Sequence, residues 1–210
     1  MASGVGCIQI AGLFLVGPFL YTIAQSHKLH PTLIQSTMSS AVYTYTIDPF
    51  IKGLQALKAI LQKTEEHAKA NNIPIDDLFN ASLGHDMKGL PFQVFICTSA
   101  AVKTLCRATL VEPPAMEQTD KTFADLYKRI DEALAALEKA DVAAIAANEG
   151  KKFKAPLGPQ EFEFTSESYA VAFAAPNFYF HLVTAYDILR AKGVPLGKMD
   201  YLAPFMAPVM

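Results

Sequence analysis

The feature that most constrains this fold is a run of apolar residues at three- and four-residue steps just after Asp48-Pro49. That spacing gathers the large side chains on one face of an α-helix, which other elements must cover. Asp48 is predicted to cap the helix, and Pro49 to occupy its first turn, where a missing N–H costs nothing. The members of this stripe are Phe50, Leu54, Leu57, Ile60 and Leu61.

Further helices are predicted along the chain. Residues 91–110 are apolar on nearly every face, which indicates a helix at the centre of the fold. The helix expected after Thr122 is apolar on one face only, and Thr122-x-x-Asp125 is a capping-box pattern. A short helix is expected near residues 75–80. The alternation of long helices and short connections predicts an all-α bundle.

The last helical run begins at residue 165 or 166 and ends at Gly193, which suits a left-handed C-cap. Pro176 lies inside this run, and an interior proline predicts a kink near residues 172–175. Residues 194–210 are apolar and rich in proline, so we expect them to lie over the bundle without forming a helix.

A different pattern precedes the last helix. Residues 151–165 alternate charged and aromatic side chains around a Leu-Gly-Pro turn, which predicts a β-hairpin. Lys152 and Lys154 on one arm face Glu161 and Glu163 on the other, as expected for cross-strand pairs. The predicted fold is therefore a four-helix bundle with a small β-hairpin before the last long helix.

Composition excludes several classes of protein. The 210 residues suit one domain, and with 51% hydrophobic and 18% charged residues the chain can bury a large core. A net charge of −2 gives no field to attract nucleic acid, so no nucleic-acid partner is expected. Cys7, Cys97 and Cys106 form an odd, sparse set without metal-binding spacing. Free thiols favour a reducing compartment, which predicts a cytoplasmic protein.

The N-terminal residues 1–37 are predicted to lie outside the bundle, which is assigned to residues 38–202 and is followed by an apolar tail at 203–210. Residues 8–24 form an apolar run without a charge, at the lower limit for a membrane helix. Three interpretations remain open: an extra segment, a signal peptide or membrane anchor, and a packed helix of the domain. Membrane attachment or secretion would depend on this run alone.

Several segments carry a family resemblance. They include DPFIKGL at 48–54, VEPP at 111–114, NFYFHLVTAYDILR at 177–190 and GVPLGK at 193–198, with Asp86-Met87 and Gln93-Val94 between them. With these motifs the chain resembles an uncharacterised family, catalogued as a domain of unknown function, among the DinB/YfiT-like bundles of bacteria and fungi. The resemblance implies a DinB-like four-helix bundle over residues 38–202.

The wider superfamily implies a divalent-metal site of three histidines, two of them as HxxxH on the last long helix, and several branches are transferases, isomerases or hydrolases. Here His181 stands at the first position, but Ala185 occupies the second and Gln93 a ligand position on the second helix. One histidine and one amide make a poor divalent site. His85 and Asp86 would complete it only if their connector folds inward, so a degenerate site without metal is expected.

The helix face that carries His181 has two interpretations. It is either a buried polar cluster, in which His181 bonds to Gln93 or to a carbonyl freed by Pro176, or the wall of a pocket. In the pocket, His181 is the candidate catalytic acid or base. Cys97 is expected to be inert, because no cation lies near it in sequence. The predicted pocket residues are Gln93, Cys97, Asn177, His181, Thr184 and Tyr186.

Three functions follow from these interpretations. The leading hypothesis is a bundle that binds a small hydrophobic molecule in a central pocket beside the degenerate metal site. The first alternative is a divalent-metal-dependent transferase, isomerase or hydrolase. The second is a structural homodimer. The sequence has no GxSxG, GxGxxG, Walker or HExxH motif, so no cofactor is expected beyond the alternative divalent metal.

Overall fold

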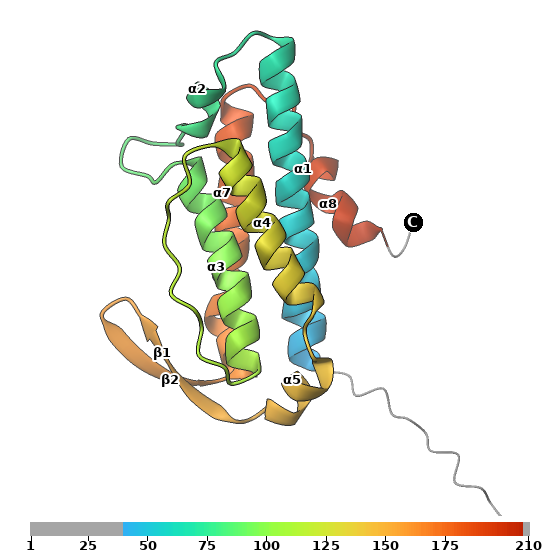
Figure 1. Cartoon of the computed structure of the whole chain (residues 1–210), viewed down its shortest axis with the longest axis vertical. Helices are drawn as coiled ribbons and strands as arrows, with labels where there is room; N and C mark the ends of the chain where they lie inside the picture. The colour runs from blue at the N-terminus through green and yellow to red at the C-terminus, as the bar shows by residue number, and fades with distance from the viewer. Residues whose placement is uncertain (1–39, 208–210) are drawn as a thin grey trace, which may run out of the picture. The chain divides into compact units, whose positions relative to one another are not determined.

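In the computed structural model of the chain, residues 40–207 are described, and they form a bundle of four long helices (Figure 1). α3 packs between α4 and α7, while α1 contacts α4 and α7 from the other side. The all-α class and the four-helix bundle are thereby confirmed. The long helices are α1 (Asp48–Ala70), α3 (Leu90–Ala108), α4 (Phe123–Glu138) and α7 (Ala175–Ala191).

Shorter elements connect and cover these helices. Two π-helical turns, η1 and η2, lead directly into α1 and α7, and a two-stranded antiparallel sheet precedes α6. The bounds are η1 (Tyr43–Ile47), α2 (Ile75–Phe79), α5 (Val142–Asn148), β1 (Lys152–Leu157), β2 (Gln160–Thr165), α6 (Ser166–Tyr169), η2 (Ala170–Ala174) and α8 (Lys198–Met206).

The core contains the whole apolar stripe predicted for α1, since each of its five large side chains is fully buried. Phe50 of this stripe stacks on Phe178 of α7, with ring centroids 4.2 Å apart. Gly53 permits this close approach, because a Cβ added there would lie 2.6 Å from Cε1 of Phe178. The glycine therefore sets how closely α1 and α7 pack.

The predicted N-terminus of the first helix is wrong. The helix continues upstream of Asp48 through η1, and Ser40 precedes its first turn, where the Ser40 hydroxyl accepts a bond from the Tyr43 N–H at 3.1 Å. Asp48 lies inside the helix, and its N–H donates to the Tyr43 carbonyl. Because Pro49 has no N–H and crowds the preceding turn, a widened π turn accommodates it inside a continuous helix.

The same arrangement occurs before α7. The sequence predicts a kink near Pro176, and the structure has a π turn there, η2, which covers residues 170–174 and in which the Ala175 N–H donates to the Ala170 carbonyl. The helix widens but continues, so α6, η2 and α7 form one run that starts at Thr165, as the sequence predicts.

The prediction that the C-terminal segment is not helical is also wrong, because α8 forms there. The Gly197 N–H donates to Oδ2 of Asp200 at 2.6 Å, and Lys63 of α1 pairs with the same carboxylate at 2.9 Å. Phe205 then packs near Tyr179 of α7, with ring centroids 6.4 Å apart. A local cap and a docking surface on α1 and α7 thus outweigh the helix-breaking composition.

The hairpin is confirmed. Its cross-strand ion pairs are Lys152–Glu163 at 2.7 Å and Lys154–Glu161 at 3.2 Å, and Gly158 turns the chain with φ of 64°. These side chains are exposed, so solvent screens both ion pairs and they add little to stability. The register places Lys154 opposite Glu163, so both ion pairs are diagonal across the strands, and the hairpin lies near one end of α3 (Figure 1).

The predicted extension at 1–37, with its apolar run at 8–24, lies outside the described residues, as does the end of the tail at 208–210. Within residues 40–207, no helix combines the length and the apolar character needed to cross a bilayer.

Candidate functional site

A cleft of about 280 Å³, which we call the α3–α7 cleft, lies between α3, the α6–α7 run and the turn of the hairpin. Residues at three- and four-residue steps on α3 form one wall, and residues at four-residue steps from 169 to 181 form the other. Ile96, Ser99, Ala100, Lys103 and Arg107 come from α3, Pro156, Leu157 and Gly158 from the hairpin, and Tyr169, Phe173, Asn177 and His181 from the last run.

His181 is held at the cleft by Gln93. Nδ1 of His181 lies 2.7 Å from Oε1 of Gln93, and Nε2 of Gln93 donates to the Lys88 carbonyl at 2.7 Å. A carbonyl only accepts, so the Gln93 amide nitrogen must face Lys88 and its oxygen must face His181. Nδ1 of neutral His181 therefore carries the proton, and Nε2 has a free lone pair. Of the two partners expected for His181, Gln93 or a carbonyl freed by Pro176, the structure shows Gln93.

The surroundings of His181 favour its neutral form. The ring is half-buried, with Phe92 and Phe180 edge-on at centroid distances of 6.0 and 5.2 Å. This burial lowers the pKa of His181 below its ordinary value. The imidazole is thus uncharged at neutral pH and offers Nε2 as an acceptor or base.

The charge of the α3–α7 cleft is positive. Lys103 and Arg107 line it, whereas none of the described residues lining it is an aspartate or glutamate. The Arg107 guanidinium lies 4.5 Å from the centroid of the Tyr169 ring and donates to the Tyr169 hydroxyl. Neither cation forms an ion pair within residues 40–207. Both charges are therefore available to an anion.

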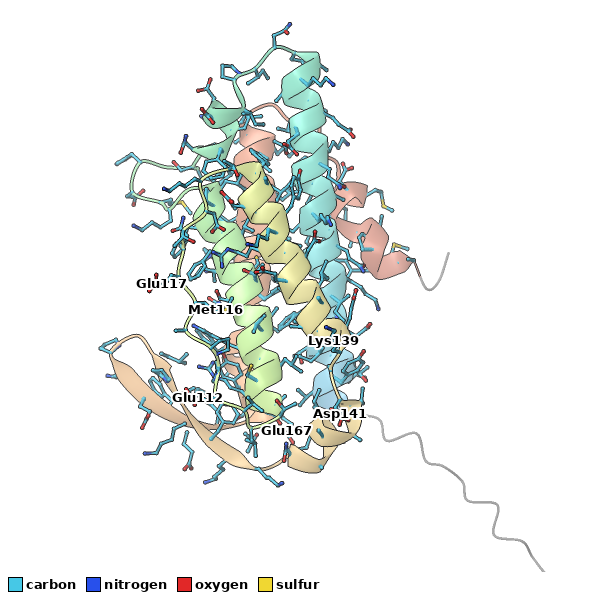
Figure 2. All side chains as sticks on the ribbon, viewed as in Figure 1. Glu112, Met116, Glu117, Lys139, Asp141 and Glu167 are labelled. Atoms are coloured by element: carbon cyan, nitrogen blue, oxygen red, sulfur yellow. The ribbon has the colours of Figure 1, made fainter. Side chains whose placement is uncertain are left out.

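One carboxylate, that of Glu112, lines a neighbouring hollow together with Lys103 and Arg107. This adjoining hollow of about 440 Å³ shares Lys103, Arg107 and Pro156 with the cleft. Figure 2 shows Glu112 toward the hairpin end of the bundle. Lys152 and Lys154 also line the adjoining hollow, so it stays cationic beside Glu112, and the α3–α7 cleft differs from it in having no carboxylate among its lining residues.

Ser99 is a further polar residue among those that line the cleft. Its side chain is 4% exposed, and its hydroxyl has no hydrogen-bond partner among the described residues. An unpaired buried hydroxyl costs on the order of 1–3 kcal/mol, and such groups are rare in folded proteins. The Ser99 oxygen itself has almost no accessible surface, so a ligand in the cleft would reach it only after a change of the Ser99 rotamer.

Asn177 and His181 are the two predicted pocket residues that line this cleft, and Gln93 lies behind His181 as its hydrogen-bond partner. Sequence reasoning missed Ser99, Lys103 and Arg107. A signal was present, because four-residue steps place these three polar side chains on one face of a helix that is otherwise apolar.

The other predicted pocket residues face elsewhere. Cys97 is fully buried with Sγ 3.7 Å from the Phe178 carbonyl, and burial raises the pKa of its thiol far above the ordinary value. Thr184 donates to the carbonyl one helical turn earlier at 2.7 Å. The Tyr186 hydroxyl donates to the Leu196 carbonyl at 3.4 Å. These groups are satisfied within the fold.

The donor set does not fit the divalent metal that the family resemblance implies. His181 has Gln93 on Nδ1, and the fully buried Ala185 occupies the position of a second histidine. His85 and Asp86 are exposed in the turn before α3. Within residues 40–207, no three His, Cys, Asp or Glu side chains are grouped to hold an ion. These side chains therefore support no chemical step through a metal.

An apolar hollow of about 380 Å³, which we call the η groove, lies between the two π turns and the start of α7. Tyr45 and Val171 at its edge are 75% and 77% exposed. The charged residue in its wall is Glu167, which Figure 2 labels near α5 and the hairpin. This groove is the structural alternative for a purely hydrophobic ligand.

The bundle, the hairpin before its last long helix and the single histidine on that helix define a DinB-like helical protein. A crystal structure described as a DinB family member protein from Shewanella denitrificans is similar, with a TM-score of 0.69 and 34% identity over 77% of this chain and 91% of that one. The family described as "Domain of unknown function (DUF1993)" matches residues 42–202, and the chain belongs to this family. No curated protein matches the chain.

Proposed function

We propose that the protein binds a small amphipathic anion, a carboxylate with an apolar body, in the α3–α7 cleft. The observation that carries this proposal is the presence of two cations, free of ion pairs within residues 40–207, beside the apolar side chains of Ile96, Ala100, Leu157 and Phe173. The proposed ligand is therefore the small hydrophobic molecule expected from the sequence, with a carboxylate head group added.

Three kinds of donor support a carboxylate head. Lys103 supplies an ammonium, Arg107 a guanidinium and Asn177 an amide. Hydrogen bonds to an ionised acceptor are shorter and stronger than neutral ones, and they gain strength where protein replaces part of the solvent.

The apolar walls and the volume define the body of the ligand. Ile96, Ala100, Leu157 and Phe173 present carbon to the interior of the cleft. Its volume of about 280 Å³ is just below the usual range of ligand sites, roughly 300–1,000 Å³. A short acyl or aryl chain matches this space better than a nucleotide or another large cofactor.

Calorimetric titration with octanoate, 1-octanol and octyltrimethylammonium tests the proposal. Octanoate should bind most tightly, and its affinity should fall with added salt because the cations attract it. Lys103→Gln should weaken octanoate about fivefold or more, which corresponds to roughly 1 kcal/mol. Lys69→Gln is the matched control, because Lys69 is exposed on α1 away from the cleft.

Two results would contradict the proposal. Octanol could bind as tightly as octanoate, which would assign binding to an apolar surface such as the η groove. Alternatively, Lys103→Gln and Lys69→Gln could have equal effects, which would show that net charge rather than the cleft attracts the anion.

A further inference from the structure

We infer that the ligand of the α3–α7 cleft carries a hydroxyl group at the end opposite its carboxylate, and that Nε2 of His181 accepts the hydrogen bond of this hydroxyl. The ligand class is thus a small hydroxycarboxylate with its two polar groups at its two ends. The inference rests on the proposed binding of an anion in the same cleft.

The hydrogen-bond chain behind His181 has a fixed direction. The Lys88 carbonyl accepts from the Gln93 amide, and the amide oxygen accepts from Nδ1 of His181. This chain leaves Nε2 of the neutral ring without a proton. Because His181 lines the cleft, the fold presents this acceptor there, in a wall that also carries the donor-only side chains of Lys103 and Arg107.

This acceptor lies at one end of the α3–α7 cleft. α3 and α7 run side by side in opposite directions, since Gln93 bonds His181 while Arg107, further along α3, bonds Tyr169 at the start of the last run. His181 therefore lies at one end of the cleft, and Arg107 lies toward the other. A ligand that lies along the cleft meets an acceptor at one end and cations at the other.

The His181 end and the cationic end of the cleft are separated by a distance that the helix rise sets. Ser99 is six residues beyond Gln93 on α3, which corresponds to roughly 9 Å along the helix axis. Lys103 lies one turn further, and its flexible four-carbon stem can bring the ammonium back toward Ser99. A straight chain of about eight carbons spans such a distance.

The wall between the two ends holds one polar group. Asn177 lies one helical turn before His181 on the last run, roughly 6 Å along the axis, and Ile96 lies on the α3 wall. A hydroxyl in the middle of the ligand would have the Asn177 amide as its side-chain partner, whereas a terminal hydroxyl finds Nε2 of His181.

Calorimetric titration with octanoate and 8-hydroxyoctanoate tests the inference. The wild type should bind 8-hydroxyoctanoate about 3- to 10-fold more tightly, the effect of one net hydrogen bond. His181→Phe should abolish this preference and still bind octanoate, because the aromatic contacts with Phe92 and Phe180 remain available. His67→Phe, a histidine on α1 outside the cleft, is the matched control and should keep the preference.

A second measurement needs no variant. Nitrogen-15 NMR of the His181 ring should show a protonated Nδ1 and an unprotonated Nε2 at neutral pH. A proton on Nε2 would overturn the inference, as would equal affinity of the wild type for the two acids or a preference that persists in His181→Phe. Each of these results leaves anion binding intact. Failure of both acids to bind would overturn the proposed function and this inference together.

Discussion

Replacement of Ser99 by alanine should make the protein more stable. The side chain is 4% exposed and its hydroxyl has no partner among the described residues, so the folded state loses hydration of this group without compensation. Relief of that loss is worth on the order of 1–3 kcal/mol, and alanine adds a few tenths of a kcal/mol of helix propensity inside α3. The few dispersion contacts of the oxygen reduce the gain, so we expect a net stabilisation of about 1 kcal/mol.

Urea unfolding followed by circular dichroism measures this change. With a slope of about 2–3 kcal/mol/M, the midpoint should rise by roughly 0.3–0.5 M. Thr98→Val is the control, because the fully buried Thr98 hydroxyl donates to the Val94 carbonyl at 3.0 Å and its removal should destabilise by about 1 kcal/mol. Loss of stability in Ser99→Ala by 1 kcal/mol or more would refute the reasoning, since it would show that the hydroxyl is satisfied in solution.

Three further predictions concern packing, protonation and thiol chemistry. Gly53→Ala should destabilise the protein by about 1–2 kcal/mol despite its better helix propensity, because the new Cβ meets the Phe178 ring at 2.6 Å. Adding Phe178→Leu to this variant should recover part of the loss, and a Gly53→Ala variant that is more stable than the wild type in urea unfolding would contradict this packing. Because burial lowers the pKa of His181 in the folded state, the unfolded state binds more protons below about pH 6.5, and the free energy of unfolding should fall as the pH drops from there toward the folded pKa. The difference in this free energy between pH 7.5 and pH 5.5 should be smaller in His181→Phe than in the wild type, and equal differences would be evidence against the shift. In the native protein, maleimide should leave the buried Cys97 unmodified and should label the half-buried Cys106 slowly, as measured by peptide mass mapping. Rapid labelling of Cys97 would contradict its burial.

Local sequence signals predict the helices well where the decisive contacts are local. The Thr122–Asp125 capping box forms as expected, and Gly193 adopts φ of 89° at the end of the α7 run. The apolar stripe of α1 is fully buried, because periodicity alone selects the face that must be covered.

The errors occur where distant parts of the chain decide the local structure. α8 forms because Lys63 of α1 holds Asp200 and because Phe205 docks near Tyr179, and these contacts have no signal in the tail itself. The Asp48-Pro49 pattern wrongly predicts a helix start because such a proline ordinarily marks an N-terminus, whereas a π turn lets the helix continue through it.

The site can be predicted only in part for the same reason. His181 and Gln93 are polar residues on helix faces that are expected to be buried, so their pairing follows from the sequence. The roles of Ser99 and Arg107 depend on how the hairpin turn and Tyr169 close the cleft over α3, which periodicity does not encode.

The central claim is that a small amphipathic anion binds in the α3–α7 cleft, and mapping of amide chemical shifts during titration with octanoate tests it most directly. We predict that the largest changes fall on Ile96, Ser99 and Asn177 and on the hairpin turn at Gly158, with saturation at a single site. Changes centred instead on the η groove, or no saturable change anywhere, would contradict this claim.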